Sequence, residues 1–212
     1  MLLPTVSVPF LFVISVSAQN GIIHYEQETR LRNVRQLTFG GEMGEAYFSF
    51  DNKQLIYQSS GAYGDKCDQI YRMDLEGPCA LQPRRVSTGL GVTTCSYFFP
   101  DNERMLFAST HKTMTYCPGK KCESEEARTN ATLHYWCNQA KYNYTWDLVP
   151  NFEIYVVNQY GHILYQLTNN TDYDAEATIS PDGKRIVYTS MESGDPELYT
   201  CDLDGSNKVQ VS

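Results

Sequence analysis

Short runs in which apolar and polar residues alternate recur along this chain, and they recur in register with one another. One nine-residue segment occurs three times, at 45–53, 95–103 and 176–184. Behind each copy comes an apolar run, at 55–57, 105–107 and 186–188. A third element, which ends in Tyr, follows at 69–71, 153–155 and 197–199. A short fourth element follows at 86–87, 167–168 and 211–212. Alternation with period two predicts β-strands.

Each repeat therefore predicts four short strands joined by hairpins. Pro181-Asp182-Gly183-Lys184 is a strong hairpin signal, because Pro presets φ and Gly accepts a positive φ. A four-stranded sheet cannot bury both of its faces alone, and stacking such sheets around an axis gives a β-propeller. We expect the layers between blades to be filled by one residue of the first strand and one of the second in each repeat: Phe48, Phe98, Ile179, Tyr57, Phe107 and Tyr188.

The third repeat carries the most specific signature. Residues 176–184 read Glu-Ala-Thr-Ile-Ser-Pro-Asp-Gly-Lys, and Glu197-Leu198-Tyr199 follows. This pattern resembles the WD-like repeat of TolB and its relatives. The likeness spans residues 32–212. The segments 31–59 and 95–110 also resemble secreted bacterial members of this family. The resemblance implies blades of a six-bladed propeller, and a role in binding proteins.

The expected organisation is a signal peptide (1–18), a linker (19–31) and a partial propeller (32–212). Its blades cover about 39–87, 88–168 and 169–212. Gln36-Leu37-Thr38 repeats the fourth element once before the first blade. Three blades do not close a ring, since closed propellers have about four to eight. The sequence is therefore a fragment or truncated isoform, the interpretation we prefer, or two chains form a homodimer that completes six blades.

The middle repeat contains an insertion at 111–150, between its second and third strands. This segment holds Cys117, Cys122 and Cys137, both tryptophans and two of the three glycosylation sequons. Loops of this length are usually functional or disordered. The cysteines favour a loop tied down by disulfides, whose tryptophans either pack beneath it or form a ligand platform.

Several features predict export. Met1–Gln19 has no charged side chain, is apolar through Val16 and ends in small residues, as expected for a signal peptide cleaved after Ala18. An uncleaved N-terminal anchor is the alternative, and no second membrane span follows. N-glycosylation sequons begin at Asn130, Asn143 and Asn169. The expected location is therefore secreted or extracellular.

Seven cysteines also fit an oxidising compartment. Cys67 and Cys95 open strands on the same side of adjacent blades, and one hypothesis is that they pair. The other disulfide candidates are Cys117, Cys122 and Cys137, whereas Cys201 lies inside a strand and is expected to be an inert core residue. The net charge of −8 disfavours nucleic acid and anionic membranes as partners.

No catalytic signature is present: the chain lacks a G-x-S-x-G elbow, HExxH, a Walker loop and G-x-G-x-x-G after a strand. No cofactor or zinc site is expected. Glu45, Asp174 and Glu176 open first strands, where they either gather around a cation in the channel or accept backbone N–H groups. Asp51, Asp101 and Asp182 are expected to serve only the hairpin turns.

Two functions remain from the sequence. In the first, the chain is a non-catalytic binding or scaffold module that recognises a protein, peptide or glycan at a propeller face or at 111–150. In the second, it is part of an enzyme, because similar repeats form the gating propellers of prolyl-oligopeptidase-type peptidases and the frame of metal-dependent sugar lyases. The first is preferred, since the repeat specifies a fold and no activity.

Overall fold

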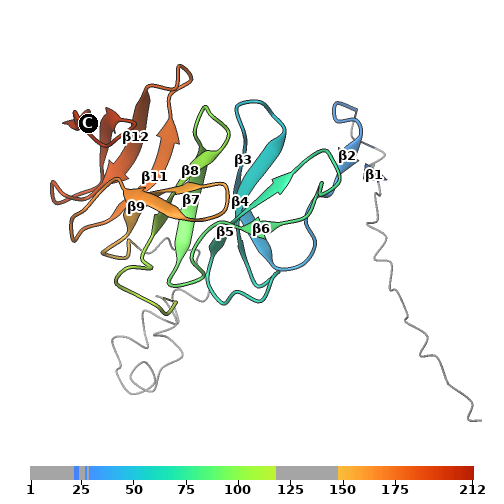
Figure 1. Cartoon of the computed structure of the whole chain (residues 1–212), viewed down its shortest axis with the longest axis horizontal. Helices are drawn as coiled ribbons and strands as arrows, with labels where there is room; N and C mark the ends of the chain where they lie inside the picture. Colours follow the sequence, from blue (N-terminus) through green and yellow to red (C-terminus); the bar gives the residue numbers. More distant parts are fainter. Residues whose placement is uncertain (1–21, 24–26, 28, 118–147) are drawn as a thin grey trace, which may run out of the picture. The chain divides into compact units, whose positions relative to one another are not determined.

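The structure is a computed structural model of the 212-residue chain, and it describes residues 22–23, 27, 29–117 and 148–212 (Figure 1). The chain forms two compact units, 1–39 and 40–212. In the first unit, β1 (Ile22–Ile23) pairs with β2 (Val34–Arg35) in antiparallel fashion. The expected strand at 36–38 is therefore shifted to 34–35, and its partner is β1.

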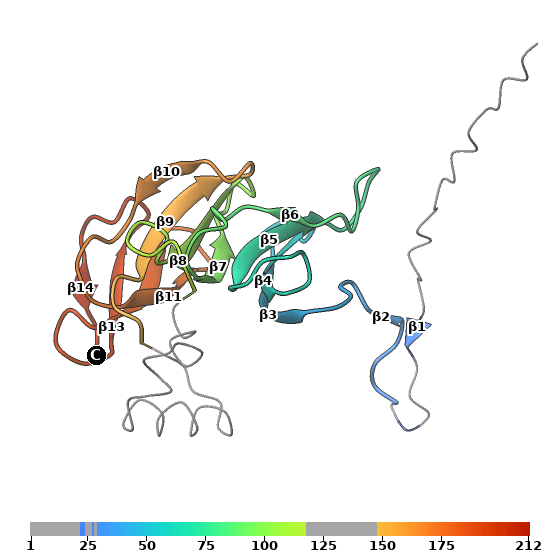
Figure 2. The ribbon, with the colours of Figure 1, turned by 90° about the horizontal axis from the view of Figure 1, so that it is seen from below.

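The second unit consists of three antiparallel sheets of four strands each, which confirms the all-β propeller-blade prediction. Blade 1 contains β3 (Glu42–Phe48), β4 (Gln54–Ser60), β5 (Gln69–Asp74) and β6 (Arg84–Arg85). Blade 2 contains β7 (Thr93–Phe98), β8 (Arg104–Ser109), β9 (Glu153–Asn158) and β10 (Ile163–Gln166). Blade 3 contains β11 (Asp174–Ile179), β12 (Arg185–Ser190), β13 (Glu197–Asp202) and β14 (Val209–Gln210). Figure 2 shows the same sheets from a second direction.

The hairpin between the first two strands has the same construction in every blade. Its third turn residue has a positive φ: 59° at Asn52, 60° at Asn102 and 70° at Gly183. The preceding Asp accepts hydrogen bonds through Oδ1, for example from the amides of Glu103 and Arg104. The pKa values of Asp51 and Asp182 are lowered mainly by the hydroxyls of Ser49 and Ser180, which donate to Oδ1, and then by the amides of Lys53 and Lys184, as the turn role predicts.

Two apolar clusters hold the three blades together. Ile56 and Ile70 of blade 1 pack with Phe98 and Phe107 of blade 2. Leu106 and Ile154 lie on the opposite face of blade 2 and pack against blade 3. The residues of blade 3 in this cluster are Ala177, Ile179, Tyr188, Tyr199 and Cys201. Blade 2 is consequently buried on both faces, which explains why β8 and β9 are nearly continuous apolar runs.

One expected core residue is exposed. Phe48 occupies the position of Phe98 and Ile179, but 57% of its surface is accessible whereas Phe98 is 0% exposed. The reason is positional, because Phe98 faces blade 1 whereas Phe48 lies on the face of β3 that is turned away from blade 2. The predicted inter-blade role of Phe48 is therefore wrong within this chain.

The described residues contain no helix, so none of them forms a helical segment that could cross a membrane.

Candidate functional site

The first strand of each blade carries a β-bulge at the same position. The pairing of β3 with β4 skips between Gly44 and Tyr47, and β7 and β11 skip at the equivalent points. The extra residue has a left-handed backbone in every case, with φ of 49° at Glu45, 52° at Cys95 and 59° at Glu176. Left-handed geometry costs a non-glycine residue about 1–2 kcal/mol. The three strained backbone positions are in register, so the bulge is a feature of the repeated blade. Backbone strain of this kind also occurs at binding sites.

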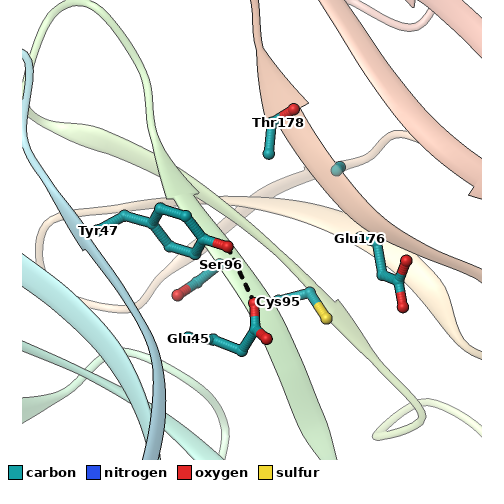
Figure 3. A pocket seen from close by; sticks show the side chains of 7 residues that line it. Glu45, Tyr47, Cys95, Ser96, Glu176 and Thr178 are labelled. Atoms are coloured by element: carbon teal, nitrogen blue, oxygen red, sulfur yellow. Dashed lines mark hydrogen bonds between the residues drawn. The ribbon is translucent and has the colours of Figure 1, made fainter.

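The bulges bring these side chains to one pocket (Figure 3). The pocket has a volume of about 370 Å³, and its lining comes from β3, β7 and β11: Glu45, Tyr47, Cys95, Ser96, Glu176, Ala177 and Thr178. Cys95 lies between the two glutamates, and the Tyr47 hydroxyl donates to Glu45 Oε2 at 3.0 Å. The lining contains two carboxylates and no basic side chain, so the site suits a cationic group.

Burial controls the chemistry of the thiol in this pocket. It raises the pKa of Cys95 to about 12, and the charges of Glu45 and Glu176 act in the same direction. Burial also raises the pKa of Tyr47 to about 12, together with its hydrogen bond to Glu45. At neutral pH both groups are therefore protonated, and Cys95 is a neutral surface of the pocket instead of a nucleophile.

The three carboxylates considered as cation ligands do not lie together. Glu45 and Glu176 are exposed at the pocket, whereas Asp174 is fully buried and does not line it. The Asp174 Oδ2 atom accepts a hydrogen bond from the Asn170 side chain at 2.5 Å, and burial raises its pKa. In the described part of the chain, no group of three His, Cys, Asp or Glu side chains could hold a metal ion.

One contact superficially resembles a catalytic pair. His111 Nδ1 lies 3.0 Å from the hydroxyl of Ser109. Ser109 is fully buried, and its hydroxyl also bonds to Thr93 and to the carbonyl of Val92. No substrate can reach this oxygen, so the pair stabilises the end of β8 and does not activate a nucleophile.

The structure corrects the expected disulfide. Cys67 is bonded to Cys117, with a Cα–Cα distance of 5.4 Å, and Cys95 is free and buried. The hypothesis failed because the bulge turns Cys95 into the pocket, while the segment after β8 brings Cys117 to Cys67. Cys201 is a buried free cysteine in the core, as expected, and Cys79 is free and exposed.

Other predicted sites lie outside the described residues. These are the signal peptide, the glycosylation sites Asn130 and Asn143, and the disulfide candidates Cys122 and Cys137. The third glycosylation site, Asn169, is described and exposed, and it lies in the connection between β10 and β11.

A second hollow of about 660 Å³ lies beside the Cys67–Cys117 disulfide. Two of its polar side chains, those of Gln69 and Asp65, are engaged within the chain. Gln69 bonds to Ser87 and to the backbone of Gly89 and Gly91, and Asp65 bonds to Tyr71 and Arg85. Lys66, Thr115 and Tyr116 also line this hollow, so unlike the pocket at Glu45 and Glu176 it carries a basic side chain.

The sequence had placed Glu45 and Glu176 at candidate positions but had assigned Cys95 to a disulfide. The repeat register contained the missing signal, because Glu45, Cys95 and Glu176 align in the three copies. A bulge adds one residue to a strand and thereby shifts the alternation of its side chains. The common direction of these three side chains therefore could not be predicted until the strand pairing was known.

No protein-family model matches the chain. It is 37% identical over 62 residues to the protein TolB homolog of Chlorobaculum tepidum, which is 29% of this chain and 14% of that protein. It is 36% identical over 56 residues to the Tol-Pal system protein TolB of Bordetella pertussis, which is 26% of this chain and 13% of that protein. The crystal structure of TolB from Acinetobacter baumannii aligns with a TM-score of 0.55 and 21% identity, over 85% of this chain and 35% of that chain.

The chain thus spans much less than two thirds of each of these relatives. The sheets and their stacking define it as a set of β-propeller blades with an acidic pocket at the first strands. Its repeat and its fold are similar to those of TolB proteins over the parts that align.

Proposed function

We propose that this chain is a non-catalytic recognition module that binds a protein or peptide, and that the pocket at Glu45, Cys95 and Glu176 receives a basic group of that partner. The observation that carries the proposal is the convergence of two exposed carboxylates in a pocket without a basic side chain. A lysine side chain, an arginine side chain or an amino terminus would fit this charge.

The backbone supports a binding role. Replacing any of the three bulge residues by glycine would relieve strain, yet each position carries a side chain that lines the pocket. The neutral thiol of Cys95 adds an apolar contact between the two charges. These features suit recognition, because they hold two carboxylates in place beside a protonated thiol that is no nucleophile.

The comparisons agree with a protein ligand. The relative from B. pertussis is named a Tol-Pal system protein, which places that relative in a system of proteins. The enzymatic alternative has no comparable support among the described residues, where the one Ser–His contact is inaccessible to a substrate. A glycan ligand and a site in 111–150 remain separate proposals.

Binding can be measured on a peptide array in which each lysine- or arginine-containing peptide is paired with its glutamine counterpart. We expect the chain to retain the basic member of each bound pair, and salt to weaken that binding. Glu45→Gln and Glu176→Gln should each reduce affinity about 10-fold, the effect of losing about 1.4 kcal/mol.

Glu103→Gln is the matched control. Glu103 is exposed in the β7–β8 hairpin and does not line the pocket, and the substitution changes the net charge equally. If all three variants lose affinity alike, the effect comes from net charge and the assigned pocket is wrong. Binding with no preference for basic peptides would also contradict the proposal.

We further propose that the chain acts outside the cytoplasm, as a secreted glycoprotein. The Cys67–Cys117 disulfide fits an oxidising compartment. The exposure of Asn169 leaves that sequon accessible to glycosylation.

A further inference from the structure

The junction between blades 2 and 3 differs from the junction between blades 1 and 2 at two equivalent positions. The first junction has Gln69 on blade 1 and Thr93 on blade 2. At the second, Glu153 of blade 2 and Asp174 of blade 3 occupy the same strand registers. Gln69 is hydrogen-bonded within the chain, and the Thr93 hydroxyl lies 2.9 Å from that of Ser109. Two neutral, paired side chains are thus replaced by two buried carboxyls.

Both carboxyls hold the connection that joins blade 2 to blade 3, residues 167–173. The amide of Asn170 donates to Glu153 Oε1 at 2.6 Å, and the Asn170 side chain donates to Asp174 Oδ2 at 2.5 Å. Burial raises the pKa of both carboxyls, and the hydroxyl of Thr168 acts on each pKa in the opposite direction. Two residues of the connection therefore contact a carboxyl of each blade.

Each carboxyl also has one oxygen that is buried and unpaired. These atoms are Glu153 Oε2 and Asp174 Oδ1, and no ion pair among the described residues includes either group. Burial raises the pKa of Glu153 most, and the charge of Asp174 raises it further. Two buried carboxylates that repel each other without a cation are costly. A proton on either one removes the repulsion and turns an acceptor into a donor.

We infer that Glu153 and Asp174 form a proton-dependent link between blades 2 and 3: the pair takes up one proton from solvent as the pH falls below neutral, and this fastens 167–173 to both blades. Loss of the proton leaves two repelling charges and loosens the connection. The two groups interact, so the proton belongs to the pair and not to one residue. Neither residue lines the proposed peptide pocket, and the link does not depend on it.

The other titratable groups next to the pair cannot produce this response. Tyr155 of β9 and Tyr188 of β12 have raised pKa values, mainly because they are buried, and stay neutral in this range. His111 contacts the ring of Tyr155, and burial, then the charge of Lys112, lowers its pKa. The folded state binds the His111 proton less tightly than the unfolded chain, so acidification of His111 weakens folding. Its effect has the opposite sign.

The test is hydrogen exchange of the full chain between about pH 5 and 8, followed by mass spectrometry and corrected for the intrinsic pH dependence of amide exchange. We expect the protection of 167–174 to rise as the pH falls, by up to about tenfold per pH unit, which is the slope for uptake of one proton. The equivalent connection at 86–92 should show no such rise, because Gln69 and Thr93 do not titrate.

Glu153→Gln combined with Asp174→Asn removes both titratable groups and should abolish the pH dependence of protection in 167–174. Glu153→Gln alone keeps one buried carboxyl and should make the dependence shallower, which keeps the test decisive if the double variant does not fold. Infrared spectroscopy provides a direct readout of the proton. Mild acidification should produce the C=O stretch of a protonated carboxyl in the wild type and not in the double variant.

Glu192→Gln is the matched control, because the charge of Glu192 also acts on Asp174 but Glu192 is paired with Lys208. This variant should keep the pH dependence of the wild type, as should Asp172→Asn, which changes an exposed carboxylate of the connection. Protection of 167–174 that does not change with pH in the wild type, or that changes equally in the double variant, overturns the inference. Protection by added Ca²⁺ at constant pH, without protection by acid, would show that the pair binds a cation and would also overturn it.

Discussion

Gln69 and Glu153 occupy the same position in blades 1 and 2, but only Gln69 has all of its polar atoms paired. Gln69 Oε1 accepts from Ser87 and from the amide of Gly89, and its Nε2 donates to the carbonyl of Gly91. Glu153 Oε1 accepts from the amide of Asn170, while its buried Oε2 has no partner. Burial is the main cause of the raised pKa of Glu153, and the charge of nearby Asp174 raises it further.

Glu153→Gln should stabilise the protein near neutral pH by about 1 kcal/mol, because it removes a poorly compensated buried charge. The folded state of the wild type binds the Glu153 proton more tightly than the unfolded chain does, so this group favours folding more as pH falls through its raised pKa. The variant should therefore show a smaller gain in stability on mild acidification. Denaturant unfolding at several pH values measures both effects.

Gln69→Glu is the reverse exchange and serves as the control. It places a carboxylate against the carbonyl of Gly91 and should destabilise blade 1 by about 1–3 kcal/mol. Equal stability changes in both variants would show that the difference in hydrogen bonding between Gln69 and Glu153 has no effect on stability.

Glu176→Gly separates backbone strain from binding. Glycine accepts the φ of 59° at this bulge, so stability should stay the same or rise by up to about 1 kcal/mol. Peptide binding at the pocket should nevertheless weaken, because a carboxylate is lost. Glu176→Ala removes the same carboxylate but keeps the strain, and it should be less stable than the glycine variant by thermal denaturation.

Among the residues that the structure describes, the free cysteines Cys79, Cys95 and Cys201 should differ sharply in reactivity. In the native protein at mildly alkaline pH, iodoacetamide should modify Cys79, which is exposed, and spare Cys95 and Cys201, whose pKa values burial raises to about 12 and about 11. Peptide mapping after alkylation, without reduction, should also recover Cys67 joined to Cys117. Rapid modification of native Cys95 would contradict its burial and the raised pKa of its thiol.

Truncating the two equivalent phenylalanines should have unequal effects. Phe98→Ala removes a fully buried ring between blades 1 and 2 and should cost about 3–5 kcal/mol. Phe48→Ala should change the stability of the monomer by no more than about 0.5 kcal/mol. Denaturant unfolding in dilute solution compares them, and similar losses for both would mean that the burial assigned here is incorrect.

Export is tested by the mature N-terminus and by glycan removal. After expression in a eukaryotic secretion host, the first residue should be Gln19, and enzymatic removal of N-glycans should increase electrophoretic mobility. Asn169→Gln should remove one glycan and thereby reduce the shift in electrophoretic mobility that enzymatic deglycosylation causes. A membrane-bound product that retains Met1 would favour the uncleaved anchor.

The fold could be predicted because each repeat is specified by short stretches of sequence. Alternation defines the strands, and Asp51, Asp101 and Asp182 mark the hairpins, so three sheets followed from the sequence. The exposure of Phe48 could not be predicted in this way, since it depends on which neighbour covers a face and not on the residue itself. The Cys67–Cys117 bond depends in turn on the path of a long insertion, for which the repeat provides no template.

The Cys67–Cys117 bond closes a loop that spans 50 residues and joins blade 1 to the segment that follows β8. Blade 3 has no such bond among the described residues and is attached to blade 2 by the chain, by packing and by hydrogen bonds such as that from the Tyr165 hydroxyl to the carbonyl of Leu203. Partial opening of the array should therefore begin by detachment of blade 3, with the first two blades departing only as a cross-linked pair. Adding a reductant would remove that hierarchy, and hydrogen exchange would then spread more evenly over the three sheets.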